Sequence, residues 1–123
     1  MMLRAEIVSP DGEILSTHYC VNDAVVARGL QIKMDDFIVE HNGKFLNKYT
    51  ADGIIFSTPT GSTAYNLSAG GPIVEPDARN MIITPICAHD MASRCIVTSD
   101  RRVITVRMTQ NARRNAFVSV DGG

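Results

Sequence analysis

Short extended segments separated by turn signals recur along this chain, and they restrict its fold more than any other feature. Residues 3–21 form two extended runs on either side of a Ser-Pro-Asp-Gly turn. Residues 34–51 form two more around Asn42-Gly43, the dipeptide that favours a two-residue type I′ hairpin. Alternating apolar and polar side chains have the two-residue period of half-buried strands. The predicted strands are residues 3–9, 13–21, 34–41, 44–51, 54–56, 81–84, 93–98, 103–109 and 117–120.

Strands this short, spaced by turns every ~8–12 residues and accompanied by a single helix, predict a mainly β, layered, sandwich-like fold. The chain has 123 residues, which is the size of one domain, and it contains no internal repeat or low-complexity linker. We therefore expect residues 1–123 to form a single domain. Pro85 follows the run at 81–84 directly, which predicts that this strand is interrupted at a sheet edge or a bend.

Composition excludes several classes of partner. The formal net charge of −1 gives no electrostatic argument for binding nucleic acid or an anionic membrane. No window approaches the ~18 apolar residues of a membrane span, and the N-terminus has no signal-peptide pattern. The three cysteines are odd in number and lack a C-x-x-C spacing, so we expect reduced thiols, two of them in the core, a cytoplasmic protein and no metal site. The expected partner is a small molecule.

The segment from Asp52 to Pro72 predicts a buried strand, a tight loop, a short helix and a stop. Residues 54–56 are apolar, and the loop after them is rich in serine and threonine. We expect Ser62 or Thr60 to cap a helix that runs to about residue 69, with free N–H groups that suit a phosphate or a ribose. No lysine follows the loop glycine, so this is not a Walker A loop. The alternative is an ordinary Ser/Thr/Gly loop.

Three acidic or amide side chains are candidates for ligand binding. Asn22 and Asp23 either form a turn with their own backbone or reach a ligand, because a carboxylate can accept two hydrogen bonds from a ribose diol. Asp52 precedes the apolar strand, where an unpaired charge would be costly, so it bonds either a backbone turn or a ligand.

The segment D-G-I-I-F-S-T-P-T-G-S-T-A-Y-N-L-S-A-G-G-P at residues 52–72 resembles the signature of the NAD kinases. The resemblance covers almost the whole chain, in the same order. The other similar segments are Asn22-Asp23, residues 50–53, residues 83–89 and residues 120–122. The family's Gly-Gly-Asp-Gly motif, which lies in its N-terminal α/β domain, has no counterpart in this sequence.

The resemblance implies that the chain is the C-terminal, NAD-binding domain of an NAD kinase. In that family the γ-phosphoryl group of ATP is transferred, with Mg²⁺, to the 2′-hydroxyl of the adenosine ribose of NAD to give NADP. The catalytic aspartate belongs to the missing domain, so no catalytic residue and little or no activity are expected here. A homo-oligomer, dimer or tetramer, is implied, with Tyr65 acting across the subunit interface. The implied NAD contacts are Asn22, Asp23, Asp52, Thr63, Ala64, Tyr65, Ser68 and Asp121.

Other functions fit the residues as well. One is a stand-alone dinucleotide-binding or sensing module, and another is a purely structural or oligomerisation module. A related lipid or diacylglycerol kinase is less consistent, because those enzymes do not share the threonine and serine loop.

Overall fold

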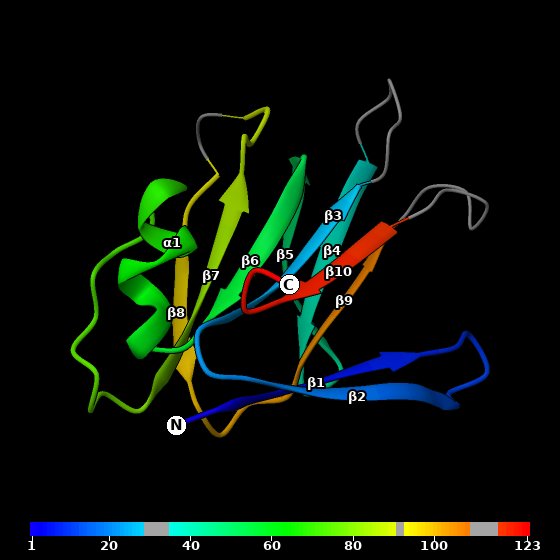
Figure 1. The fold of residues 1–123 in the computed structure, drawn as a ribbon. Coiled ribbons are helices and arrows are strands. Elements are labelled where there is room, and N and C mark those ends of the chain that lie inside the picture. The colour runs from blue at the N-terminus through cyan, green and yellow to red at the C-terminus, as the bar shows by residue number, and fades with distance from the viewer. Residues whose placement is uncertain (29–34, 91–92, 109–115) are drawn as a thin grey trace.

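The structure of the chain is a computed structural model. It describes residues 1–28, 35–90, 93–108 and 116–123 (Figure 1). Its helical elements are a 3₁₀ helix, η1, and one short α-helix, α1. The elements are β1 Leu3–Val8, β2 Ile14–Cys20, β3 Asp23–Arg28, β4 Asp35–His41, β5 Lys44–Ala51, β6 Gly53–Ser57, η1 Thr60–Thr63, α1 Tyr65–Ser68, β7 Asn80–Ile86, β8 Ile96–Ser99, β9 Ile104–Met108 and β10 Ala116–Val120.

The described strands form three antiparallel sheets. The largest has the order β10-β3-β6-β7-β8, the second has the order β5-β4-β9, and β1 pairs with β2 in a separate hairpin. The five-stranded and three-stranded sheets pack face to face, which is the layered arrangement of a sandwich. The prediction of a mainly β, sandwich-like fold with one short helix is therefore confirmed.

The core lies between these two sheets. Successive side chains of a strand point to opposite faces, so Ile54 and Phe56 of β6 and Ile83 of β7 face the same way. They meet Phe37 and Val39 of β4, as the alternation in residues 34–41 predicted. Each fully buried side chain of this size contributes about 1.5–3 kcal/mol through removal of apolar surface from water. The buried core residues are Phe37, Val39, Tyr49, Ala51, Ile54, Phe56, Met81 and Ile83.

The outer face of the five-stranded sheet is partly covered by η1 and α1 (Figure 1). All five residues of β6 are buried, so this strand is covered on both faces, as its continuous apolar run predicted. Buried Asn66 of α1 joins the layers. Its Nδ2 donates to the carbonyl oxygens of Ser62 and Pro72 at 3.0 Å each, and its Oδ1 accepts from Thr84 Oγ1 of β7 at 2.6 Å.

Two predicted turns have the expected geometry. Asn42 and Gly43 have φ values of 49° and 81°, which are the positive values that a type I′ turn needs. The N–H of Gly12 donates to the carbonyl oxygen of Ser9 at 2.9 Å, which closes the turn between β1 and β2.

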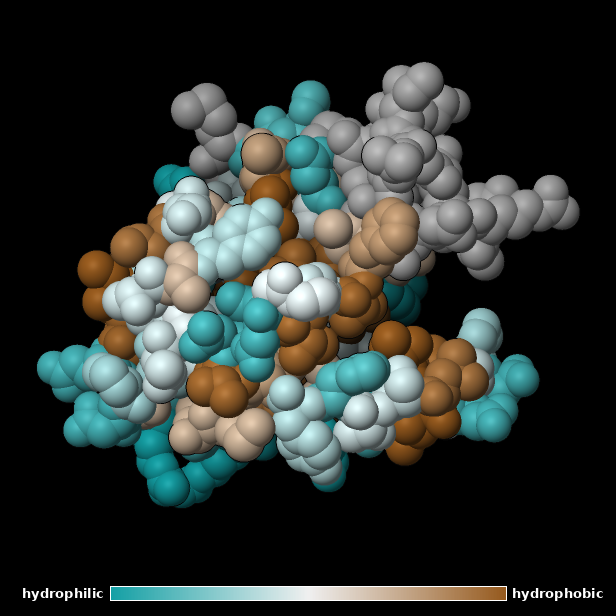
Figure 2. Space-filling view, viewed as in Figure 1, coloured by the Kyte–Doolittle hydropathy of each residue, from teal (hydrophilic) through white to brown (hydrophobic). Residues whose placement is uncertain are grey.

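The β1–β2 hairpin projects from the two packed sheets, and hydrophobic side chains gather near its turn (Figure 2). Its exposed apolar residues include Ile7, Val8, Ile14 and Leu15.

The structure corrects one prediction about strands and adds one strand that was not predicted. Strand β7 continues through Pro85, where the sequence predicted an interruption. Pairing with β8 ends at Ile83, so β7 has only β6 beside it at Pro85, and the missing N–H costs no ladder hydrogen bond on the β8 side. Strand β3 was not predicted at all. It lies inside the largest sheet, between β10 and β6.

Among the described residues, no helix is long and apolar enough to cross a membrane. The thiols of Cys20, Cys87 and Cys95 are all free, and only Cys20 is buried. Two buried cysteines were expected, so that prediction was wrong for one of them.

Candidate functional site

A pocket of about 430 Å³ opens on the outer face of the five-stranded sheet. It lies where β2 passes into β3, where α1 begins and where β10 ends. Its volume falls in the range of small-molecule sites, about 300–1,000 Å³. The lining residues are Asn22, Asp23, Val25, Ala64, Tyr65, Ser119, Asp121 and Gly122.

Asp23 is a buried acid at the wall of this pocket. It begins β3 directly opposite Ser57 of β6, and only 4% of its surface is exposed. Burial raises its pKa, and the nearby charge of Asp121 raises the pKa further. Within the described part of the chain, no residue donates a hydrogen bond to its carboxylate. A buried carboxylate without a donor is costly, so this group is suited to a ligand that supplies hydroxyl or amide hydrogens.

Asp121 uses its carboxylate differently, although it lines the same pocket. Its Oδ2 accepts from the N–H of Val21 at 2.8 Å, and its Oδ1 accepts from the N–H groups of Asn22 at 2.7 Å and Asp23 at 3.1 Å. These hydrogen bonds, led by the one from Val21, lower the pKa of Asp121. The carboxylate is therefore ionised at neutral pH and engaged with the backbone.

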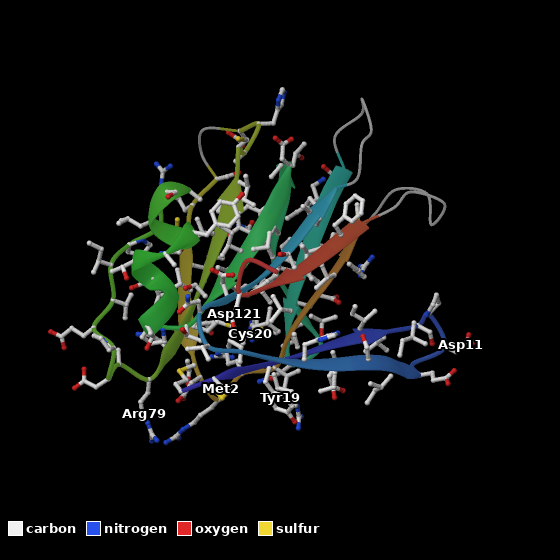
Figure 3. The ribbon with its side chains drawn as sticks, viewed as in Figure 1. Met2, Asp11, Tyr19, Cys20, Arg79 and Asp121 are labelled. Carbon is white, nitrogen blue, oxygen red and sulfur yellow. The ribbon has the colours of Figure 1, made fainter. Side chains whose placement is uncertain are left out.

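Cys20 lies beside this cluster, near Asp121 (Figure 3). Burial raises the pKa of its thiol to about 11, and the charges of Asp121 and Asp23 contribute to the shift. The thiol is therefore protonated at neutral pH, and thiolate chemistry at this position is not expected.

The loop after β6 packs against Asn22 from the opposite side. The N–H of Thr58 donates to the carbonyl oxygen of Asn22 at 2.9 Å, and Thr58 Oγ1 donates to that of Val21 at 2.6 Å. A Cβ at Gly61 would lie 2.5 Å from the carbonyl carbon and 2.7 Å from the Cα of Asn22, and closer still to its carbonyl oxygen. Only glycine allows this approach between the two backbones.

The hydroxyl groups of this loop are largely internal. Ser57, Thr58 and Ser62 are buried, and Ser62 Oγ donates to the carbonyl oxygen of Val74 at 3.2 Å. Neither η1 nor α1 has a side-chain cap, so the predicted capping by Ser62 or Thr60 was wrong. The segment forms the 3₁₀ helix η1 followed by the short α-helix α1, in place of one continuous helix that runs to about residue 69. A helix N-terminus long enough to bind phosphate is therefore absent from residues 60–68.

The structure brings five of the predicted site residues together at the pocket: Asn22, Asp23, Ala64, Tyr65 and Asp121. Thr63 and Ser68 are exposed on η1 and α1 but do not line it. Asp52 lies at the other end of β6, and roughly 16 Å of extended strand separates it from Ser57.

Three lining residues escaped the sequence analysis: Val25, Ser119 and Gly122. Ser119 and Val25 are directly opposite each other in the β10–β3 ladder. Because β3 was not recognised as a strand, nothing in the sequence linked these two positions. Gly122 adjoins Asp121 in the predicted Asp-Gly pair, and that pair was the available signal.

The fold and the pocket define a β-sandwich domain with a pocket of small-molecule size at one end of its larger sheet. Residues 21–123 match the family described as the ATP-NAD kinase C-terminal domain, and the chain belongs to this family. It is 46% identical over 122 residues to the NAD kinase of Acetivibrio thermocellus, covering 99% of this chain and 42% of that protein. It is 43% identical over 108 residues to the NAD kinase of Desulforamulus reducens, covering 88% of this chain and 37% of that protein.

Solved structures agree with these sequence relatives. Yeast NADH kinase, complexed with NADH, superimposes with a TM-score of 0.88 at 32% identity, covering 98% of this chain and 35% of that one. An NAD kinase from Archaeoglobus fulgidus, in complex with ATP, gives a TM-score of 0.75 at 31% identity. The match covers 98% of this chain and 46% of that chain. The chain thus spans about two fifths of the length of the relatives it matches.

Proposed function

We propose that this chain binds NAD at the pocket beside β3 and β10 and that it does so as the NAD-binding part of an NAD kinase. The buried carboxylate of Asp23, which lines the pocket without a donor from the described residues, is the observation that carries the proposal. A ribose diol supplies two hydroxyl hydrogens to such a carboxylate. The NADH-bound relative and the family match support this choice of ligand.

The neighbouring side chains suit the other parts of a nucleoside. The amide of Asn22 can both donate and accept hydrogen bonds, and it forms none within the described residues. The ring of Tyr65 is 46% exposed and offers an aromatic face on which a base or a nicotinamide can stack. Because both come from elements fixed against β6, the ligand would meet a preformed surface.

Asp52, Thr63 and Ser68 remain proposed NAD contacts from the family resemblance. The position of Asp52 at the far end of β6 means that, within one chain, it does not line the pocket that contains Asp23. We propose that a second copy of the chain brings its Asp52 to the NAD molecule bound in this pocket. That proposal rests on the homo-oligomer, dimer or tetramer, that the family resemblance implies. A cytoplasmic location also remains a proposal and rests on the three free cysteines.

We further propose that the complete protein transfers the γ-phosphoryl group of ATP to the 2′-hydroxyl of the adenosine ribose, giving NADP. In this reaction the present chain binds and orients NAD, the phosphoryl acceptor. Holding two reactants in the correct geometry supplies a large part of the rate enhancement of such a transfer. Among the described residues, no group of three His, Cys, Asp or Glu gathers to bind Mg²⁺, so no step is assigned to a metal here. The isolated chain is expected to form little or no NADP in a coupled assay.

Asp23→Asn is expected to weaken NAD binding by about tenfold to a hundredfold, because hydrogen bonds to charged groups are worth about 1.5–3 kcal/mol. The measurement is isothermal titration of the 123-residue chain with NAD. Asp77→Asn is the matched control, since Asp77 is exposed and away from the pocket. If the wild-type chain binds NAD and Asp23→Asn binds it equally well, Asp23 is not the diol acceptor.

The same substitution should raise stability at neutral pH. The pKa of Asp23 is raised in the folded state above its ordinary value of 3.8, so the ionised side chain opposes folding above that pH. Asn removes this cost, and its advantage disappears as the pH falls below 3.8, where both folded and unfolded Asp23 are protonated. Thermal unfolding of the wild type and of Asp23→Asn at pH 7 and pH 3 measures this difference in stability. Equal unfolding midpoints of the two proteins at both pH values would contradict the prediction.

A further inference from the structure

The backbone of residues 21–23, which we call the 21–23 turn, is bonded from two sides. We propose that Asp121 and Thr58 are positioning residues that fix the 21–23 turn, so that the side chains of Asn22 and Asp23 face the ligand. The geometry of the turn stands independently of any ligand. Its importance for NAD binding rests on the function proposed above.

Asp121 approaches the turn from the C-terminal end of β10. Its carboxylate accepts the three N–H groups of residues 21–23, and its own N–H donates to the carbonyl oxygen of Asp23 at 3.0 Å. Asp121 and Gly122 have φ values of 50° and 77°, and the N–H of Gly123 donates to the carbonyl oxygen of Val120 at 3.0 Å. This is a type I′ turn, and it folds the carboxylate of Asp121 back over the start of β3.

Thr58 approaches from the other side. Its side chain is fully buried. Its Oγ1 donates to the carbonyl oxygen of Val21 and accepts a hydrogen bond from the N–H of Gly61 at 2.9 Å. Its N–H donates to the carbonyl oxygen of Asn22. The hydroxyl is therefore bonded as both donor and acceptor, which leaves it no role in direct contact with a ligand.

Together these two residues satisfy every backbone polar group of the 21–23 turn. Asp121 accepts hydrogen bonds from the three N–H groups and donates its own N–H to the carbonyl oxygen of Asp23. Thr58 donates to the carbonyl oxygens of Val21 and Asn22. Backbone polar groups in folded proteins are nearly always paired, and here two residues far away in the sequence complete the pairing. The side chains of Asn22 and Asp23 form no hydrogen bond within the described residues, so they remain available to the pocket.

The inference changes the role that the sequence assigned to Asp121. A carboxylate lining a ligand pocket was predicted to contact NAD. Oδ1 already accepts two hydrogen bonds and Oδ2 accepts one, all from backbone N–H groups. Asp121 thus acts on the ligand through Asn22 and Asp23.

The test uses Asp121→Asn and Thr58→Val, with Thr58→Ser as the conservative variant that keeps the hydroxyl. Proton–nitrogen NMR spectra of the ligand-free chain report the amide hydrogen bonds of residues 21–23 directly. In the wild type these three amide protons should be shifted downfield by the carboxylate, and in Asp121→Asn they should move upfield. NAD affinity should fall by at least about tenfold in Asp121→Asn and Thr58→Val. Thr58→Ser should stay within about threefold of the wild type.

Asp77→Asn and Thr17→Val are the matched controls, because both residues are exposed and lie outside the pocket. Neither should change the three amide signals or the affinity for NAD. A fall in affinity in Asp121→Asn with the three amide signals unmoved would make Asp121 a direct ligand contact and overturn the inference. Thr58→Val with wild-type affinity would also overturn it.

The outcomes separate this inference from the proposed function. If the wild-type chain does not bind NAD, the proposed function fails, while the amide signals still decide whether Asp121 bonds the turn. If Asp121→Asn does not fold, the comparison of Thr58→Val with Thr58→Ser provides the affinity test. Wild-type amide protons of residues 21–23 without a downfield shift would refute the inference without any variant.

Discussion

Gly61→Ala is expected to destabilise the chain by about 3 kcal/mol or more and to remove NAD binding, because it forces a methyl group into a space that backbone atoms occupy. The Cβ would lie 2.5 Å from the carbonyl carbon of Asn22 and 2.7 Å from its Cα. Flexible side chains could move away, but Asn22 belongs to the 21–23 turn, which Asp121 and Thr58 bond on both sides. Urea unfolding measures the stability and calorimetry the affinity.

Gly12→Ala is the matched control for this prediction. Gly12 has a φ of +88°, so alanine there adopts an unfavourable backbone conformation, but no atom lies within 4 Å of its Cβ. The expected cost is about 1–2 kcal/mol from conformation alone, with no effect on NAD binding. Equal losses for both variants would mean that the contact with Asn22 is not what requires glycine at position 61.

Much of the fold could be predicted because its signals are local. The alternation in residues 34–51 and the Asn42-Gly43 turn predict the β4–β5 hairpin from one short segment, although not the register shift between Val39 and Glu40. Strand β3 carries no such signal. Its sequence is apolar and short, and its two neighbours, β6 and β10, come from later parts of the chain. Their pairing depends on packing of distant segments, which periodicity does not reveal.

The candidate site was predictable to a similar extent. The residues around Asn22 and Tyr65 could be found because the resemblance rests on short continuous motifs. The sequence does not reveal which hydroxyl groups of the loop after β6 point into the protein and which point outward. Thr58 is buried and Thr60 is exposed, although both follow the same strand and have the same side chain. The role of Asp121 was also hidden, since its partners are backbone N–H groups 98 to 100 positions away.

Asn66→Asp is expected to destabilise the chain by about 3–5 kcal/mol at neutral pH, although it changes the side-chain volume very little, because it buries an uncompensated charge. In the wild type Nδ2 of Asn66 donates to the carbonyl oxygens of Ser62 and Pro72. The ionised carboxylate that this substitution introduces would instead place an oxygen against both carbonyl oxygens, in a position with no exposed surface. The two hydrogen bonds to Ser62 and Pro72 would be lost, whereas the hydroxyl of Thr84 could still donate to the carboxylate.

The pH dependence distinguishes this effect from a simple loss of two hydrogen bonds. Burial and the facing carbonyl oxygens would raise the folded-state pKa of the new carboxyl above its unfolded value of about 3.9. The penalty should therefore be small near pH 4 and should grow as the pH rises, because the folded state then binds the proton more tightly than the unfolded state. Asn42→Asp is the matched control, since Asn42 is at the surface, and its Oδ1 accepts from the N–H of Val103, as a carboxylate also can. Urea unfolding at pH 4 and pH 7 measures both variants, and a loss in Asn66→Asp that is the same at the two pH values would show that the buried charge is not its cause.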